Sequence, residues 1–210
     1  MIGLGRFGQS VAAELMRRGW DVLGVDADVG VVQKVGEELT QVAAADCTDP
    51  AALAQLGVGE FSRVVVGIGT DLEASILTTS ALLRFNKPTI WAKAVSAAHG
   101  QILEQLGVKH VIRPEQDMGR RVAHLVRGAM LDYVEFEDGF AMVKTRPPKE
   151  AVGRPLGDTG IRSKHHVTIV AAKRPGQEWD YTTTSTVLHE GDEIIVAGAT
   201  SAAERFATLL

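Results

Sequence analysis

The chain contains little that would point to an exported, membrane-spanning or nucleic-acid-binding protein. Among its 210 residues there is a single cysteine, Cys47, which excludes an internal disulfide and fits a reducing cytosol. The chain has no apolar run of about 18 residues and no signal-peptide core. Its net charge of -4 argues against nucleic-acid binding, which needs a basic surface. The sequence therefore predicts a cytoplasmic protein with no nucleic-acid partner, and it leaves open docking onto a membrane protein.

Alternating strand and helix patterns fill the chain from its start to about residue 130. Short β-branched runs such as 63–68 alternate with helical patterns such as 72–85. Repeated units of this kind predict a doubly wound, Rossmann-like parallel sheet with helices on both faces. From residue 133 the pattern changes to strand alternation around the hairpin pair Asp138-Gly139, followed by a polar segment, further strands and a short final helix. We therefore predict an α/β domain at 1–131 and a small α+β module at 132–210.

A glycine motif of the type GxGxxG lies at Gly3, Gly5 and Gly8, and the next apolar run ends at Asp26. In a mononucleotide-binding unit, the first glycine permits a tight turn and the second lets the backbone approach a pyrophosphate. The third lets the helix pack closely on the strand, and the acid binds ribose hydroxyls. The helix N-terminus offers unpaired N–H groups to phosphate. The pattern predicts nucleotide binding, with a ligand-free glycine turn as the alternative.

The strand before this motif is short. Only Met1 and Ile2 precede Gly3, whereas a strand usually has about 5–6 residues. Either the first strand is very short or the native chain has further residues before it, and the sequence leaves both open.

Residues beside the motif have both a ligand-binding and a structural interpretation. Arg6 would reach a terminal phosphate, or it would be an ordinary surface arginine. Asp26 would hold a ribose, or it would cap a helix that starts at Ala27. A carboxylate at this position repels a 2′-phosphate, so the cofactor is expected to have a free ribose hydroxyl. Phe7 and Ala27, which directly follow Arg6 and Asp26 in the chain, are expected to lie beside the ligand.

The ends of the later strands supply the remaining candidates, at the sheet edge where ligands bind in such folds. Asp46 would accept a bond from an adenine amino group or form a turn, and Cys47 is expected to be a packed residue rather than a reactive thiol. The loop Gly67-Ile68-Gly69 would allow close backbone approach or simply turn the chain. Lys93 would neutralise phosphate or be a surface lysine. Glu115, beside Asp117 at the start of a long helix, suits the helix dipole, and a divalent-cation role would need ligands from elsewhere in the chain.

Several separated segments, in order, are similar to one known family. They are GLGRFG at 3–8, the stretch 67–79, WAKA at 91–94, RPEQDMG at 113–119, VGRPL at 152–156, VTIVAA at 167–172 and EGD at 190–192. Together they resemble the RCK (regulator of potassium conductance) subunits of bacterial Ktr and Trk potassium-uptake systems, of the KtrA/TrkA type. The resemblance covers nearly the whole chain.

The resemblance implies a non-enzymatic gating subunit. Such subunits form dimers, usually within an octameric ring, beneath a membrane potassium-translocating subunit of the KtrB/TrkH type. They bind ATP or ADP, in some members NAD(H), and nucleotide exchange switches the conformation of the ring.

The resemblance also implies roles for single residues. Arg6 would contact the terminal phosphate of ATP, Asp26 the ribose, the Asp46-Cys47 region the adenine and Lys93 the phosphates. Glu115 matches a position that binds an activating cation (Mg²⁺, Ca²⁺ or Na⁺) at the dimer interface. Some relatives bind cyclic di-AMP in the C-terminal module, where the matching strand is 169–174. The short first strand and the segment Tyr181–Thr184, where relatives often have proline, depart from the family pattern.

Two other functions stay open. An NAD(H)-sensing regulatory module would use Asp26 without needing Arg6. An NAD-dependent oxidoreductase is less favoured, because the C-terminal module is small for a substrate domain. The sequence also shows no Tyr-x-x-x-Lys pair and no suitably spaced His–carboxylate pair.

Overall fold

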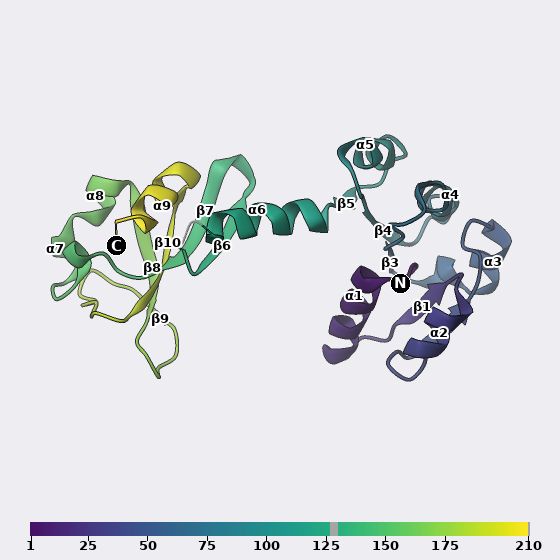
Figure 1. Ribbon diagram of the computed structural model, residues 1–210, viewed down its shortest axis with the longest axis horizontal. Helices are drawn as coiled ribbons and strands as arrows, with labels where there is room; N and C mark the ends of the chain where they lie inside the picture. Colours follow the sequence, from purple (N-terminus) through teal and green to yellow (C-terminus); the bar gives the residue numbers. More distant parts are fainter. Residues whose placement is uncertain (127–129, 210) are drawn as a thin grey trace. The chain divides into compact units, whose positions relative to one another are not determined.

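The computed structural model describes residues 1–126 and 130–209, which form two compact units, residues 1–115 and 116–210. Figure 1 labels the helices and strands of both units. The division falls within α6 (Pro114–Val126), whereas the sequence analysis placed the limit after that helix, at residue 131. The domain limits 1–131 and 132–210 stay a prediction. In the described parts of the chain, no helix combines the length and apolarity needed to cross a bilayer.

The first unit is an α/β layer structure. In chain order its elements are α1 (Arg6–Arg17), β1 (Leu23–Asp26), α2 (Val29–Val35), β2 (Gln41–Ala44), α3 (Pro50–Gln55), η1 (Val58–Glu60), β3 (Arg63–Val66), α4 (Leu72–Leu82), β4 (Thr89–Lys93), α5 (Ala97–Gln105), β5 (His110–Ile112) and the start of α6. Strands β1 and β2 pair in parallel, and so do β3, β4 and β5.

Ile2 joins these two groups of strands into one sheet. It forms parallel bridges with Val25 on one side and Val66 on the other. Its N–H donates to the carbonyl of Val65 at 2.8 Å, and its own carbonyl accepts from Gly67 N at 2.7 Å. The short segment predicted from the sequence therefore lies at the centre of the sheet, between β1 and β3.

Helices cover both faces of this sheet, as the alternating pattern predicts. One apolar cluster, which includes Leu4, Ala12 and Val35, packs α1 and α2 on one face. A larger one, which includes Leu53, Leu82 and Leu103, packs α3, α4 and α5 on the other (Figure 1). Polar caps fix where these helices begin: Asp49 accepts from Ala51 N and precedes Pro50 at the first position of α3.

The second unit is a small α+β structure. Its elements are the rest of α6, β6 (Asp132–Phe136), η2 (Glu137–Gly139), β7 (Phe140–Thr145), η3 (Lys149–Ala151), α7 (Leu156–Thr159), α8 (Ile161–His165), β8 (Val167–Lys173), β9 (Asp180–Tyr181), β10 (Glu193–Ala199) and α9 (Thr200–Ala207). The antiparallel sheet has the order β6-β7-β10-β8-β9, and a core including Ile194, Val196 and Phe206 packs α9 against it.

One element of this unit is as predicted and another is not. The β6–β7 hairpin turns at Asp138 and Gly139, which have positive φ values of 61° and 70°. The polar segment expected before β8 instead contains the short helices α7 and α8.

Candidate functional site

A cavity of about 1090 Å³ opens in the first unit at the carboxyl ends of the parallel strands. This is the edge at which doubly wound sheets bind ligands. All the candidate residues from the sequence except Gly8 line it: Gly3, Gly5, Arg6, Phe7, Asp26, Ala27, Asp46, Cys47, Gly67, Ile68, Gly69, Lys93 and Glu115. The structure therefore brings together residues from six separate segments of the chain.

The three glycines of the motif have different surroundings. Gly3 has a φ of +86°, which side chains rarely adopt and which suits a tight turn. A Cβ on Gly8 would lie 1.9 Å from the carbonyl oxygen of Gly3, so Gly8 allows α1 to pack onto the turn instead of lining the cavity. A Cβ on Gly5 would meet no heavy atom within 4 Å, so the backbone at Gly5 is open to the cavity.

The N-terminus of α1 can accept an anion. Gly5 is the N-cap and supplies no side-chain acceptor, and the first turn contains no acidic residue. Its leading N–H groups and the positive end of the helix dipole therefore lie beside the cavity together with the exposed guanidinium of Arg6. Phosphate oxygens are the groups that such an arrangement binds.

Asp26 is held in place by two backbone donors. Its Oδ2 accepts from Leu4 N at 2.7 Å and its Oδ1 from Asp28 N at 2.9 Å. Asp28, not Asp26, caps α2, so the capping interpretation of Asp26 is wrong. Because each carboxylate oxygen has two lone pairs, Asp26 can still accept hydroxyl donors from a ligand.

The loop after β2 combines a polar turn with a packed thiol. Asp46 Oδ1 accepts from the hydroxyl and the N–H of Thr48, at 2.7 and 2.9 Å, and these bonds hold the pKa of Asp46 below its ordinary value. Asp46 thus forms the predicted turn while also lining the cavity. Burial raises the pKa of the Cys47 thiol to about 11, which fits a packed residue and not a nucleophile.

Lys93 and Glu115 form an ion pair within the same cavity. Lys93 Nζ lies 2.6 Å from Glu115 Oε1 and 5.4 Å from the centre of the Phe7 ring. The lysine side chain is 10% exposed and that of Glu115 is 69% exposed. The hydrogen bond from Lys93 holds the pKa of Glu115 below its ordinary value, and the charge of Arg6 adds to this. The Glu115 carboxylate is therefore ionised at neutral pH.

These residues alone do not fit a metal ion. Glu115 offers one carboxylate, and the described residues contain no group of three or more His, Cys, Asp or Glu side chains that could hold a metal. A cation at Glu115 would need ligands from a second subunit or from a bound phosphate.

Several residues of the cavity wall were not predicted from the sequence. Ala74 and Thr78, one turn apart on α4, line the cavity together with Ser10 and Val95. The Thr78 hydroxyl is fully buried and has no hydrogen-bond partner among the described residues. Ala74 and Thr78 are four residues apart on the helix that follows the glycine loop, so they lie on the same helix face. This spacing could have indicated that both face the cavity.

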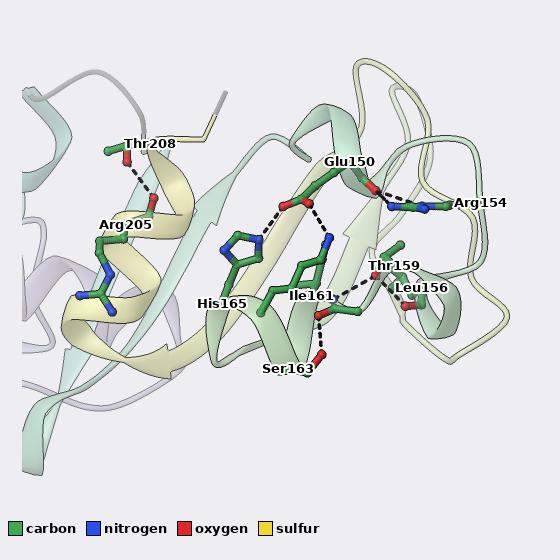
Figure 2. Close-up of polar contacts among 11 residues, drawn as sticks. Glu150, Arg154, Leu156, Thr159, Ile161, Ser163, His165, Arg205 and Thr208 are labelled. Atoms are coloured by element: carbon green, nitrogen blue, oxygen red, sulfur yellow. Dashed lines mark hydrogen bonds and ion pairs between the residues drawn. The ribbon is translucent and has the colours of Figure 1, made fainter.

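A second cavity, of about 720 Å³, lies in the C-terminal unit. Arg162 and Ser163 of α8, Val170 of β8, and the segment 181–184 line it. Of the strand 169–174, matched above to a cyclic di-AMP site, Ile169 and Val170 line this cavity and the later residues do not. Glu150 holds helix α8, which forms one wall of this cavity, because its carboxylate accepts hydrogen bonds from His165 and Lys164. The backbone carbonyl of Glu150 accepts from Arg154 (Figure 2).

Comparisons with known proteins agree with this arrangement. The TrkA-N domain model matches residues 1–114 and the TrkA-C domain model residues 140–210. Ktr system potassium uptake protein C of Bacillus subtilis (strain 168) is 36% identical over 98% of this chain and 94% of its own length. Ktr system potassium uptake protein A of the same strain is 32% identical over 98% and 93%.

A solved structure described as the GsuK channel bound to NAD superposes with a TM-score of 0.69 at 18% identity. The match covers 98% of this chain but 38% of that one, and it shows the fold alone. The resemblance and the fold class stated from the sequence are thereby confirmed. The chain belongs to the family of RCK-domain regulatory subunits, with TrkA-N and TrkA-C domains, of bacterial Ktr and Trk potassium-uptake systems.

Proposed function

We propose that this chain is a nucleotide-binding regulatory subunit that gates potassium transport through a membrane partner of the KtrB/TrkH type. One observation carries the proposal: Asp26, the Asp46 loop, the start of α1, Arg6 and Lys93 all line a single cavity. On the proposal, Asp26 and the Asp46 loop would form its adenosine end, and α1, Arg6 and Lys93 would form its phosphate end. On this proposal the protein acts at the cytoplasmic face of the membrane and catalyses no reaction.

ATP and ADP are the proposed ligands. Arg6 is charged, exposed and at the first position of α1, so it suits a terminal phosphate that only ATP supplies. A ligand shifts a conformational equilibrium only by binding one state better than another. Contact between Arg6 and the terminal phosphate would provide that difference and so let nucleotide exchange switch the assembly.

The proposal includes self-association into dimers and an octameric ring, and two apolar surfaces support it. A hollow of about 420 Å³ in the first unit is lined by Phe7, Trp20, Trp91 and Ile112 among others. Helix α6 has no buried residue among those described and exposes Met118, Val122 and Val126. Apolar surfaces of this kind are typical of subunit contacts.

Two further ligands belong to the proposal. An activating cation (Mg²⁺, Ca²⁺ or Na⁺) would take Glu115 as one of its ligands in the assembled dimer. Cyclic di-AMP would bind at the C-terminal cavity, where Arg162 supplies a positive charge for its phosphates.

NAD(H) is the alternative ligand. The cavity continues past the glycine turn to Thr78, whose buried hydroxyl has no partner in the part of the chain that the structure describes. It therefore has room and a polar group for the second half of a dinucleotide. This reading keeps the regulatory role and needs no catalytic group.

Two measurements test the proposed function. Calorimetric titration of the purified chain with ATP, ADP, NAD and NADH is expected to show binding of ATP and ADP in preference to the dinucleotides. Potassium uptake by vesicles containing the membrane subunit is expected to depend on this chain and to differ between ATP and ADP. If none of the four ligands binds, the proposal is contradicted.

A further inference from the structure

The proposed phosphate end of the cavity contains the buried ammonium group of Lys93, which is paired with the exposed carboxylate of Glu115. Lys93 follows the buried residue Ala92 at the end of β4, and its ammonium lies over the Phe7 ring. A Cβ on Gly69 would come within 3.3 Å of this ammonium, so the glycine gives it room. A buried ammonium needs a counter-charge, because transfer from water is costly without one. In the described structure that counter-charge is Glu115.

The two partners differ in how freely they can move. Glu115 is 69% exposed and lies in the first turn of α6, so rotation into solvent leaves its carboxylate hydrated. Lys93 is 10% exposed and is confined by Phe7 and Gly69. If the pair separates, Glu115 is therefore the member that leaves, and Lys93 stays at the phosphate end.

A nucleotide phosphate would compete for the same ammonium. Phosphate bound at the N-terminus of α1 lies beside Phe7, the ring that Lys93 covers. It brings more negative charge than a carboxylate, and a phosphate and a carboxylate that approach the same ammonium repel each other. We propose that Glu115 is a built-in competitor that occupies Lys93 until a nucleotide phosphate displaces it.

This exchange has two consequences, and both rest on the proposed nucleotide binding. The Lys93–Glu115 pair must break when a phosphorylated nucleotide binds, so it lowers affinity for phosphate while leaving adenosine unaffected. The displaced carboxylate belongs to the first turn of α6, so occupation of the cavity changes the contacts at the start of that helix. By thermodynamic reciprocity, anything that holds Glu115 away from Lys93 raises affinity for the phosphorylated ligand.

The test compares ADP with adenosine in the full chain. Calorimetry with chelator present, so that no divalent cation contributes, is carried out on the parent and on Glu115→Gln. We expect the variant to bind ADP about tenfold more tightly, the effect of one charge-assisted contact, and adenosine equally. Asp117→Asn is the matched control, because it also removes one negative charge from α6. Asp117 pairs with Arg120 and not with Lys93, so this variant is expected to change neither affinity.

A double variant separates competition from a general charge effect. Lys93→Met is expected to weaken ADP binding, and adding Glu115→Gln to it is expected to give no further gain, because the shared ammonium is gone. Unchanged or weaker ADP binding by Glu115→Gln overturns the inference while leaving the proposed function standing. Failure of the parent to bind ADP at all overturns both.

Discussion

Gly5 and Gly8 are three residues apart in one motif, yet the same substitution should affect them in different ways. Gly8→Ala is expected to destabilise the fold, whereas Gly5→Ala is expected to keep the fold and impair phosphate binding. The pair therefore separates the packing role of the motif from its ligand role.

The structure gives the size of each effect. The new Cβ at Gly8 would lie 1.9 Å from the backbone oxygen of Gly3, which cannot move without shifting the central strand. Adding a methyl group to a well-packed core typically lowers the free energy of unfolding by about 1–3 kcal/mol. Because the contact here is with a backbone atom at the centre of the sheet, we expect a loss of about 3 kcal/mol or more. At Gly5 the φ of -65° suits alanine and no atom lies within 4 Å of the new Cβ. The exchange of glycine for alanine at an N-cap should cost less than about 1 kcal/mol.

Scanning calorimetry and ADP titration on both variants check this reasoning. Because two compact units need not unfold together, calorimetry is preferred to a single spectroscopic transition. The transition of the first unit should fall by roughly 10 °C or more in Gly8→Ala and by only a few degrees in Gly5→Ala. Gly5→Ala should bind ADP at least about tenfold more weakly. A Gly8→Ala protein as stable as the parent, or parental ADP affinity in Gly5→Ala, would refute the assignment of that glycine.

Three further predictions follow from single side chains. Arg6→Ala should reduce the preference for ATP over ADP, measured by calorimetry, and an unchanged ratio would remove Arg6 from the terminal phosphate. Cys47, buried and with a pKa raised to about 11, should react with a disulfide reagent at mildly alkaline pH far more slowly in the folded protein than in urea. Hydrogen bonds from His165 and Lys164 lower the pKa of Glu150 from 4.5, so the stability that they give at neutral pH is lost as pH falls through the lowered value. Urea titrations from about pH 5 to about pH 3, followed by tryptophan fluorescence, should show that the free energy of unfolding falls less steeply with pH in Glu150→Gln than in the parent.

The sequence could predict the parts of the site that depend on local geometry. The roles of Gly3 and Gly8 follow from backbone conformation and close packing, which the motif spacing encodes, and the structure agrees at both. The sequence could not predict that Glu115 is the ion-pair partner of Lys93. Glu115 is 22 positions away, and only the parallel order of β4 and β5 brings the start of α6 to the same edge.

In the C-terminal unit the same contrast appears. The Asp138-Gly139 pair marks a hairpin because both residues tolerate positive φ, and the strands around it alternate clearly. Helices α7 and α8 were missed because each is shorter than two turns, so neither shows an apolar period. Tertiary contacts form them instead, including the burial of Ile161 and the bonds that Glu150 makes with the end of α8.

The division of the cavity into two ends determines which residues can act as a switch. Asp26 and the Asp46 loop would meet groups that ATP and ADP share, so contacts there strengthen binding of both nucleotides equally. Equal affinity for two ligands cannot distinguish the states that they stabilise, however tight the binding is. On the proposed function, discrimination would therefore arise at the phosphate end, from Arg6, which would meet the terminal phosphate that only ATP supplies. Glu115, which a bound phosphate would displace from Lys93, lies in the first turn of α6, so phosphate binding would change the contacts at the start of that helix.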